Sequence, residues 1–334
     1  MARRLSEAQL LALADALSDG AWRSGEELAA AAGITRAALA KRVEHLRDWG
    51  LVVVTQPGLG YRLDPPLQRL SAEGICAAWP PGVPQPSSLR VLACTDSTNQ
   101  QLLSADGAGD PQLLLAEMQT AGRGRRGRHW RSPFGANLYL SLAWSFPTWP
   151  LQLGTLPLAC GVACARALSD AGVPVSLKWP NDLRVGGRKL GGILVEQRGE
   201  AGGACRVVIG VGVNQAMAAP QAAGIDQPWT TVQAECAARG RVAPQRNALA
   251  AALAASLLAA MHDYAVAGFE PFRSDWARFD ETAGKAVRVQ FGEQRIEGLA
   301  RGIDSSGALQ LEVDGVVRAV LAGDVSLRFA EDSR

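Results

Sequence analysis

Apolar and polar positions divide the chain into regions of different period. Residues 1–63 place apolar side chains at helical spacing behind polar capping residues, which predicts a helical unit. Proline-rich residues 65–90 predict a linker. From about residue 91 to residue 280, strand-like segments alternate with helical ones and predict an α/β domain. Residues 284–330 form short alternating segments, and the Asp314-Gly315 dipeptide predicts a tight hairpin in a small β-barrel.

The first region has the pattern of a helix-turn-helix. The link Ala32-Gly33-Ile34-Thr35 joins the second predicted helix to a third, which Thr35 is expected to cap and which runs to Gly50. Residues 51–54 and 56–63 then predict a strand, a turn and a second strand, which form a wing. The cations expected to contact DNA are Arg36, Lys41 and Arg42. A three-helix protein-interaction module is the alternative, because 8 basic and 7 acidic residues over 1–63 give a net charge of only +1.

The composition is that of a large globular chain. Its 334 residues are 48% hydrophobic and carry a formal net charge of +2, so an anion must be recognised locally rather than by bulk charge. We expect no apolar stretch of membrane-spanning length, and the start at Met1 does not have the pattern of a signal peptide. Six cysteines without a Cys-x-x-Cys pair and only three histidines predict no metal site and a reduced, cytoplasmic protein.

A glycine- and arginine-rich segment lies inside the α/β region. Gly122–Arg131 contains five arginines and three glycines and no acidic residue, so regular structure is not expected there. Like charges repel and arginine suits forked phosphate contacts, which predicts a mobile loop that becomes ordered around a phosphate. A solvated or nonspecific RNA-binding segment is the alternative, and the strand-like segments at 112–117 and 137–142 on either side disfavour it.

Other polar groups stand at or inside the predicted strands. Asp96-Ser97-Thr98-Asn99 follows one strand and is either a helix N-cap or a set of hydrogen-bonding groups for a small ligand. Lys178 lies in an apolar strand, where an ammonium requires an anionic partner from the protein or from a ligand. The neighbouring strands expected at 188–196 and 206–214 contain glycines that allow close approach of a ligand or backbone. Trp229 is either a core side chain or a stacking platform for a base.

Three motifs, in this order and spacing, resemble the biotin–protein ligase family. They are Gly122–Trp130, Lys178-Trp179-Pro180-Asn181-Asp182 and Lys189–Glu196. The helix-turn-helix and the C-terminal barrel resemble the bifunctional bacterial branch, the biotin operon repressor and biotin–[acetyl-CoA-carboxylase] ligase. The resemblance implies an α+β multidomain chain. The implied domains are a winged helix-turn-helix at 1–64, a linker at 65–90, a class-II-synthetase-like catalytic domain with a mixed sheet at 91–280, and an SH3-like barrel at 281–334.

The resemblance also implies a two-step reaction. Biotin and ATP, which carries Mg²⁺, give biotinyl-5′-adenylate, and a lysine on the biotin carboxyl carrier domain of acetyl-CoA carboxylase then takes the biotin. A homodimer with the adenylate bound is expected to bind operator DNA, and no membrane partner is expected. Because a carboxylate attacking a phosphate is one anion approaching another, the site must supply positive charge and alignment.

Site residues are implied wherever this sequence matches the family motifs. The residues implied to contact biotin are Ser97, Thr98, Asn99, Gln119, Arg123, Gly124, Arg125 and Lys178. The residues implied to contact ATP or the adenylate are Arg125, Arg128, Asn214 and Trp229, the last by stacking on adenine. The implied catalytic residues are Arg123, Arg125 and Lys178. His129 stands where relatives often carry lysine, at a position that we interpret as peripheral.

Two alternative functions stay open. One is a ligand-sensing repressor without catalysis, which the complete arginine-rich segment and Lys178 disfavour. The other is a lipoate–protein ligase, a family with related chemistry and fold. The arginine-pair, glycine-rich and His-Asp signature of that family is not found in this sequence.

Overall fold

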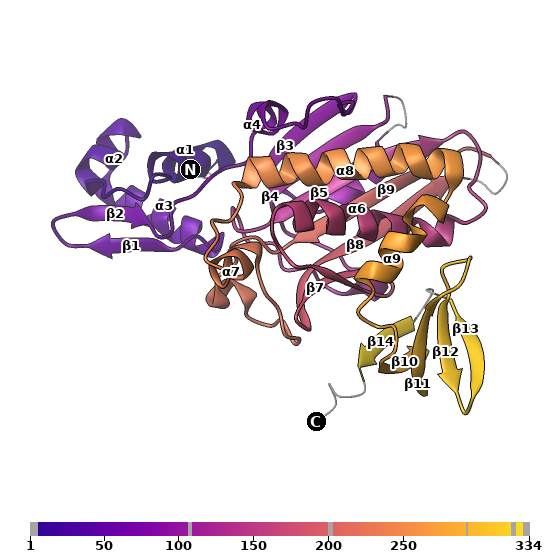
Figure 1. The fold of residues 1–334 in the computed structure, drawn as a ribbon. Coiled ribbons are helices and arrows are strands. Elements are labelled where there is room, and N and C mark those ends of the chain that lie inside the picture. Colours follow the sequence, from indigo (N-terminus) through magenta and orange to yellow (C-terminus); the bar gives the residue numbers. More distant parts are fainter. Residues whose placement is uncertain (1–5, 106–108, 200–202, 292, 322–324, 330–334) are drawn as a thin grey trace.

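The computed structural model describes residues 6–105, 109–199, 203–291, 293–321 and 325–329. The start at Met1 and the predicted domain ends at residues 1 and 334 lie outside the described residues. The chain forms an N-terminal helical unit, a central sheet domain and a C-terminal sheet, and the helical unit and the C-terminal sheet lie at opposite ends of the central domain (Figure 1).

The described part of the N-terminal unit consists of three helices and a two-stranded antiparallel sheet: α1 (Glu7–Ala16), α2 (Gly25–Ala31), α3 (Arg36–Asp48), β1 (Val53–Gln56) and β2 (Gly60–Leu63). Thr35 caps α3 as predicted, because its hydroxyl accepts a hydrogen bond from the backbone N–H of Ala38. Leu39, Val43 and Leu46 of α3 are at most 1% exposed, so the apolar stripe of this helix faces the core of the unit.

The segment that follows the helical unit contacts both neighbouring parts of the molecule. The backbone N–H of Leu67 donates to the carbonyl of Ser18 at 2.8 Å, and that of Leu70 donates to the buried Glu117 carboxylate at 2.5 Å. Strand β3 begins at Ser88, within the stretch that the sequence predicts as linker. The predicted linker is therefore a packed connection that ends in a sheet strand.

A mixed sheet of seven strands forms the centre of the described molecule, in the order β3-β4-β5-β9-β8-β7-β6. β3 runs parallel to β4, and the other neighbouring strands run antiparallel. β8 and β9 are neighbours, as predicted. The bounds are β3 (Ser88–Thr95), β4 (Gln112–Gln119), β5 (Leu138–Phe146), β6 (Ser176–Lys178), β7 (Asp182–Val185), β8 (Arg188–Gly199) and β9 (Cys205–Val213).

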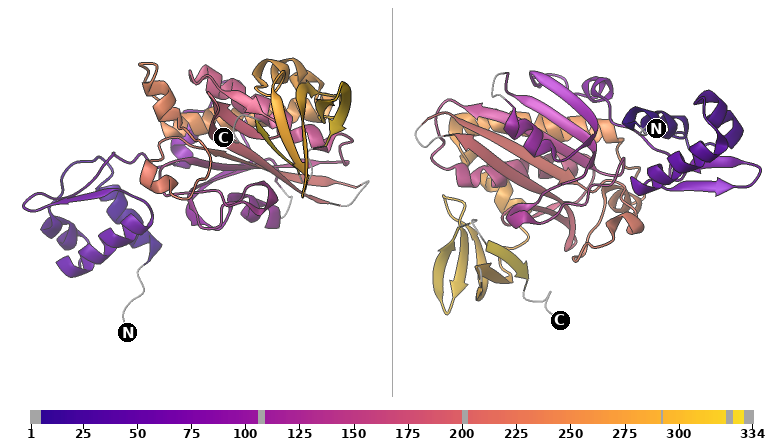
Figure 2. Two further views of the ribbon diagram at one scale, coloured as in Figure 1. Left: turned by 90° about the horizontal axis from the view of Figure 1, so that it is seen from below. Right: turned by 180° about the vertical axis from the view of Figure 1, so that it is seen from behind.

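Helices cover both faces of this sheet (Figure 2). Leu113 and Leu115 of β4 face the core formed with α6 and α8, whereas Leu114 faces Leu102 of α5 on the opposite side. Residues of α5 thereby lie against β4, β5, β8 and β9. The helix bounds are α4 (Ala72–Ala77), α5 (Thr98–Ser104), α6 (Leu156–Asp170), α7 (Val232–Ala237), α8 (Arg246–Ala267) and α9 (Arg273–Phe279).

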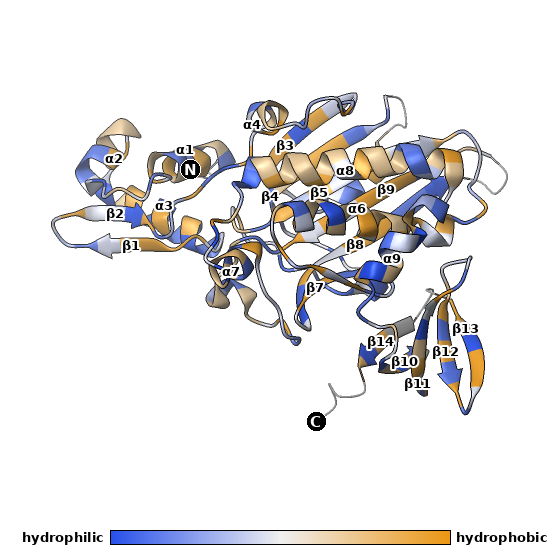
Figure 3. Ribbon diagram, viewed as in Figure 1, coloured by the Kyte–Doolittle hydropathy of each residue, from blue (hydrophilic) through white to orange (hydrophobic). Residues whose placement is uncertain are grey.

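Helix α8 corrects one expectation from the sequence. By length and composition it is a candidate membrane span among the described residues, so the expectation that no apolar stretch reaches spanning length is wrong. Figure 3 shows that α8 is apolar along most of its length, and it lies against α6 and β5. Its apolar residues Leu249, Leu253, Leu257 and Met261 are at most 1% exposed, which is the burial of a core helix.

The C-terminal part is a five-stranded antiparallel sheet in the order β13-β12-β11-β10-β14. Asp314 and Gly315 have φ values of 51° and 75° and connect β12 to β13, which confirms the predicted hairpin. Strand β14, which the sequence did not predict, pairs with β10. The bounds are β10 (Ala286–Phe291), β11 (Gln294–Ile303), β12 (Leu309–Val313), β13 (Val316–Val320) and β14 (Val325–Phe329).

Candidate active site

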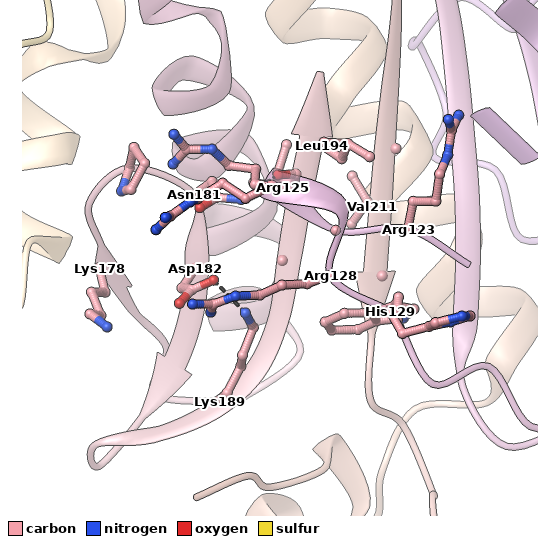
Figure 4. A pocket seen from close by; sticks show the side chains of 18 of the residues that line it. Arg123, Arg125, Arg128, His129, Lys178, Asn181, Asp182, Lys189, Leu194 and Val211 are labelled. Atoms are coloured by element: carbon pink, nitrogen blue, oxygen red, sulfur yellow. Dashed lines mark hydrogen bonds and ion pairs between the residues drawn. The ribbon is translucent and has the colours of Figure 1, made fainter. Parts of the chain in front are cut away.

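A cavity of about 440 Å³ lies between the arginine-rich segment and strands of the central sheet (Figure 4). Its volume falls in the range of about 300–1,000 Å³ that is common for small-molecule sites. Nine predicted ligand-contact residues line it: Ser97, Thr98, Asn99, Gln119, Arg123, Gly124, Arg125, Arg128 and Lys178. Asn214 and Trp229 are not among the described residues that line the cavity.

A hydrogen-bonded network holds one side of the cavity. Thr98 donates from its backbone N–H and is paired through its hydroxyl to Gln119 Oε1, at 2.9 and 3.1 Å. The hydroxyl of Ser141 lies 2.7 Å from that of Thr98 and 2.6 Å from Asn99 Oδ1. Ser97 caps α5, which confirms the N-cap interpretation of this polar cluster. Ser97, Thr98 and Asn99 also line the cavity, and their contact with a ligand stays a prediction. Ser141, on β5, was missed because it lies inside an apolar strand.

Two glycines of β9 make room for side chains of the site. A Cβ atom at Gly210 would collide with the side-chain amide of Asn99. One at Gly212 would lie 2.6 Å from the indole ring of Trp130. The strand therefore requires glycine at both positions. The groups that approach these two glycines are neighbouring side chains.

The arginine-rich segment is a closed turn rather than an irregular run. Arg123 and His129 form an isolated antiparallel bridge, and the backbone N–H of Gly124 donates to the carbonyl of Arg128 at 2.7 Å. Arg125–Gly127 form a single 3-10 turn in which Arg126 has a left-handed φ of 59°, so the segment has a defined turn but no regular helix. Arg125 and Arg128 point toward the side of the cavity that holds Asp182, whereas Arg123 points the other way (Figure 4).

Lys178 lies opposite Asp182 in the β6–β7 hairpin. The Asp182 carboxylate forms its ion pair with Lys189 of β8, at 2.6 Å, and the Lys178 ammonium lies 5.7 Å from the ring centroid of Phe329. Burial lowers the pKa of Lys178 to about 8, Asp182 opposes that shift, and Arg184 and Lys189 add to it. Burial would raise the pKa of Asp182, but Lys189 and Lys178 outweigh burial and hold it below its usual value. The sequence missed Lys189 and Asp182 as a cross-strand pair.

The predicted adenylate residues lie beside the cavity. Asn214 is 4% exposed and donates from Nδ2 to the carbonyl of Thr230 at 3.2 Å. Trp229 packs partly buried on a small apolar cluster that includes Met217. Residues 226–228, directly before Trp229, do line the cavity. The structure thus brings this segment to the cavity but leaves the tryptophan ring in an apolar cluster.

The predicted DNA-contacting cations differ in exposure. Arg36 and Lys41 are exposed on α3. Arg42 is only 8% exposed and lies on the buried side of the helix with Val43. A phosphate contact by Arg42 therefore requires its side chain to turn outward.

Comparison with protein families and solved structures defines the class of protein to which this chain is similar. Residues 91–214 match the model of the Biotin/lipoate A/B protein ligase family, and residues 282–328 match that of the Biotin protein ligase C terminal domain. The biotin protein ligase of Aquifex aeolicus, solved in complex with biotin and ATP, is similar in fold with a TM-score of 0.62 and 26% identity. That similarity covers 73% of this chain and 99% of the other.

Curated relatives that are similar over nearly the whole chain define the family more closely. The chain is 43% identical over 325 residues to the bifunctional ligase/repressor BirA of Salmonella typhimurium, covering 96% of this chain and 98% of the relative. It is 43% identical to the protein of the same name from Escherichia coli, covering 94% and 96% of the two chains. It is 37% identical to the biotin--[acetyl-CoA-carboxylase] ligase of Mycobacterium tuberculosis, covering 79% and 97%. The chain belongs to the biotin protein ligase family.

Proposed function

We propose that this chain is a biotin protein ligase that also represses biotin biosynthesis genes. As a ligase it forms biotinyl-5′-adenylate from biotin and Mg-ATP, and then transfers biotin to a lysine of a biotin carboxyl carrier domain. The observation that carries the proposal is the cavity in which Lys178 and the arginines of one turn surround a hydrogen-bonding wall. The relatives named bifunctional ligase/repressor support both activities, since the similarity extends over at least 94% of this chain.

In this proposal the two sides of the cavity have different tasks. Ser97, Thr98, Asn99, Gln119 and the backbone at Gly124 hold biotin. The cations Arg123, Arg125 and Lys178 align the biotin carboxylate with the α-phosphate of ATP and offset the negative charge of the transition state. Arg128 contacts the nucleotide phosphates. This assignment requires no general acid or base, because the carboxylate already carries the attacking electron pair.

The adenylate end of the site is proposed to close over its ligand. Asn214 contacts the nucleotide, and Trp229 leaves its apolar cluster to stack on adenine. The arginine-rich segment closes over the mixed anhydride and excludes the water that would hydrolyse it. The position of residues 226–228 on the cavity wall supports this assignment.

The N-terminal unit is proposed to be the winged helix-turn-helix that binds operator DNA. In this proposal α3 enters the major groove, β1 and β2 form the wing, and Arg36, Lys41 and a reoriented Arg42 contact DNA. One unit buries little surface, so we propose that a homodimer with adenylate bound occupies a two-fold operator. The exposure of Arg36 and Lys41 supports this placement.

The remaining organisation follows from the same proposal. The C-terminal five-stranded sheet is an SH3-like barrel, and the central domain has a class-II-synthetase-like fold. The domains span residues 1–64, 91–280 and 281–334, with the linker at 65–90 between the first two. The protein works in the cytoplasm on the carrier domain of acetyl-CoA carboxylase.

Two single variants test the ligase assignment. In Arg125→Ala and Lys178→Ala proteins, biotin- and ATP-dependent pyrophosphate release is expected to fall on the order of 10²–10³-fold, because each variant removes one transition-state cation. Arg198→Ala is the control, since Arg198 is exposed near the far end of β8. Wild-type protein without pyrophosphate release would leave a ligand-sensing repressor, and release with lipoate in place of biotin would indicate a lipoate ligase.

A further inference from the structure

Glu196 of β8 stands where two predicted ligand-binding elements meet. Its carboxylate accepts a hydrogen bond from Asn99 Nδ2 at 2.8 Å and lies 3.1 Å from the guanidinium of Arg123. Gln100 Oε1 accepts a second hydrogen bond from Arg123, also at 3.1 Å. Asn99 and Arg123 line the cavity, but Glu196 is not among the described residues that do. The Glu196 carboxylate therefore contacts two residues that are assigned to biotin, without itself lining the cavity.

The pairing explains the direction of Arg123. Arg125 and Arg128 extend toward the Asp182 side of the cavity, whereas Arg123 extends away from them (Figure 4). A guanidinium is suited to a carboxylate or a phosphate, and here the carboxylate is supplied by the protein. The pair also reduces repulsion among the clustered arginines of this turn.

We infer that Glu196 is a positioning residue that occupies Arg123 while the site is free of ligand, and that the anionic group of the ligand must displace it. When the ligand binds, its anion replaces Glu196 as the partner of Arg123. The hydrogen bond between Glu196 and Asn99 is kept. The inference rests on the proposed function, because it takes the ligand's anion to be the biotin carboxylate or the phosphate of the adenylate.

The strength of the pair sets the size of the expected effect. The side chains of Arg123 and Glu196 are 40% and 23% exposed, so water screens their attraction. A partly exposed pair of this kind is weak, and its loss is expected to tighten biotin binding by about two- to fivefold.

Glu196→Gln is the informative variant, because glutamine keeps an acceptor for Asn99 and removes the charge that holds Arg123. Calorimetry of the full chain with biotin alone is expected to give a Kd about two- to fivefold lower than wild type. In an Arg123→Ala background, the same Glu196→Gln change is expected to leave the Kd unaltered. Glu73→Gln, at an exposed carboxylate in the first turn of α4, is the charge-matched control.

Other results of the biotin titration would overturn either the inference about Glu196 or the proposed function. Weaker or unchanged biotin binding by Glu196→Gln, or an equal change with and without Arg123, would overturn the inference and leave Glu196 a structural ion-pair partner. Wild-type protein that binds biotin normally in the same experiment shows that only this inference has failed. Wild-type protein that does not bind biotin would overturn the proposed function itself.

Discussion

At the scale of single residues, the pKa of one cation of the site, Lys178, depends on its surroundings. Lys178 is largely removed from water, which lowers its pKa to about 8, and Asp182 across the hairpin opposes this shift. The ion pair of the Asp182 carboxylate is with Lys189, at 2.6 Å. A bound anion stabilises the charged form of Lys178, so the lowered pKa belongs to the protein before ligand binds.

The pH dependence of adenylate formation is the first prediction. Lys178 is protonated below pH 8 and neutral well above it, so kcat/KM for biotin is expected to fall by up to about tenfold per pH unit as pH rises beyond about 8. Lys178→Arg keeps its charge over that range, because a guanidinium does not lose its proton. The kcat/KM of Lys178→Arg can be lower at every pH, but it is expected not to fall as the pH rises beyond about 8. Identical breakpoints in both proteins would assign the titration to another group.

At the scale of elements, the sequence predicts local signals and the pairing of β8 with β9, but not the other pairings between distant segments. The cap at Thr35 and the turn at Asp314-Gly315 depend on a few consecutive residues, and both formed as expected. β14 pairs with a strand far back in the sequence, and Glu196 meets Arg123 only through the fold. The motifs identified nine of the residues that line the cavity. The partners that position these residues depend on strand register, which sequence periodicity does not define.

The fit of Trp130 against β9 gives a prediction for these two elements. Gly212→Ala places a methyl group 2.6 Å from the indole ring, so the ring and the turn it anchors must shift. Biotin affinity, measured by calorimetry, is expected to drop on the order of tenfold. Gly154→Ala, where the added methyl group meets open space, should bind as wild type does. Equal affinities for all three proteins would show that the ring does not anchor the turn.

At the scale of the whole molecule, the end of α3 contacts residues that lie next to both segments proposed to close on ligand. Trp49 stacks on Phe134, which follows the arginine-rich segment, with ring centroids 4.8 Å apart and planes at 22°. Gln221 Nε2, in the segment before Trp229, donates to the carbonyl of Gly50 at 2.7 Å. We therefore expect a change at either segment to reach the proposed recognition helix through these contacts.

Removal of this junction is expected to separate the two activities. In Trp49→Ala, the factor by which biotin and ATP strengthen operator binding is expected to fall by up to about tenfold, because the stacked pair is gone. Carrier labelling by this variant is expected to stay near the wild-type rate. Trp22→Ala, at a tryptophan beside Arg62 in the same unit, is the matched control and should retain the dependence. A Trp49→Ala protein with wild-type ligand dependence would place the coupling elsewhere.

The most direct test of the central claim is one titration of the full chain with biotin and ATP, read by both carrier-domain labelling and operator DNA binding. We predict that both signals rise over the same ligand range, that operator binding weakens as the protein is diluted, and that Arg125→Ala loses both. Absence of labelling would contradict the ligase, and operator binding that ignores biotin and ATP would contradict a single site that serves catalysis and repression.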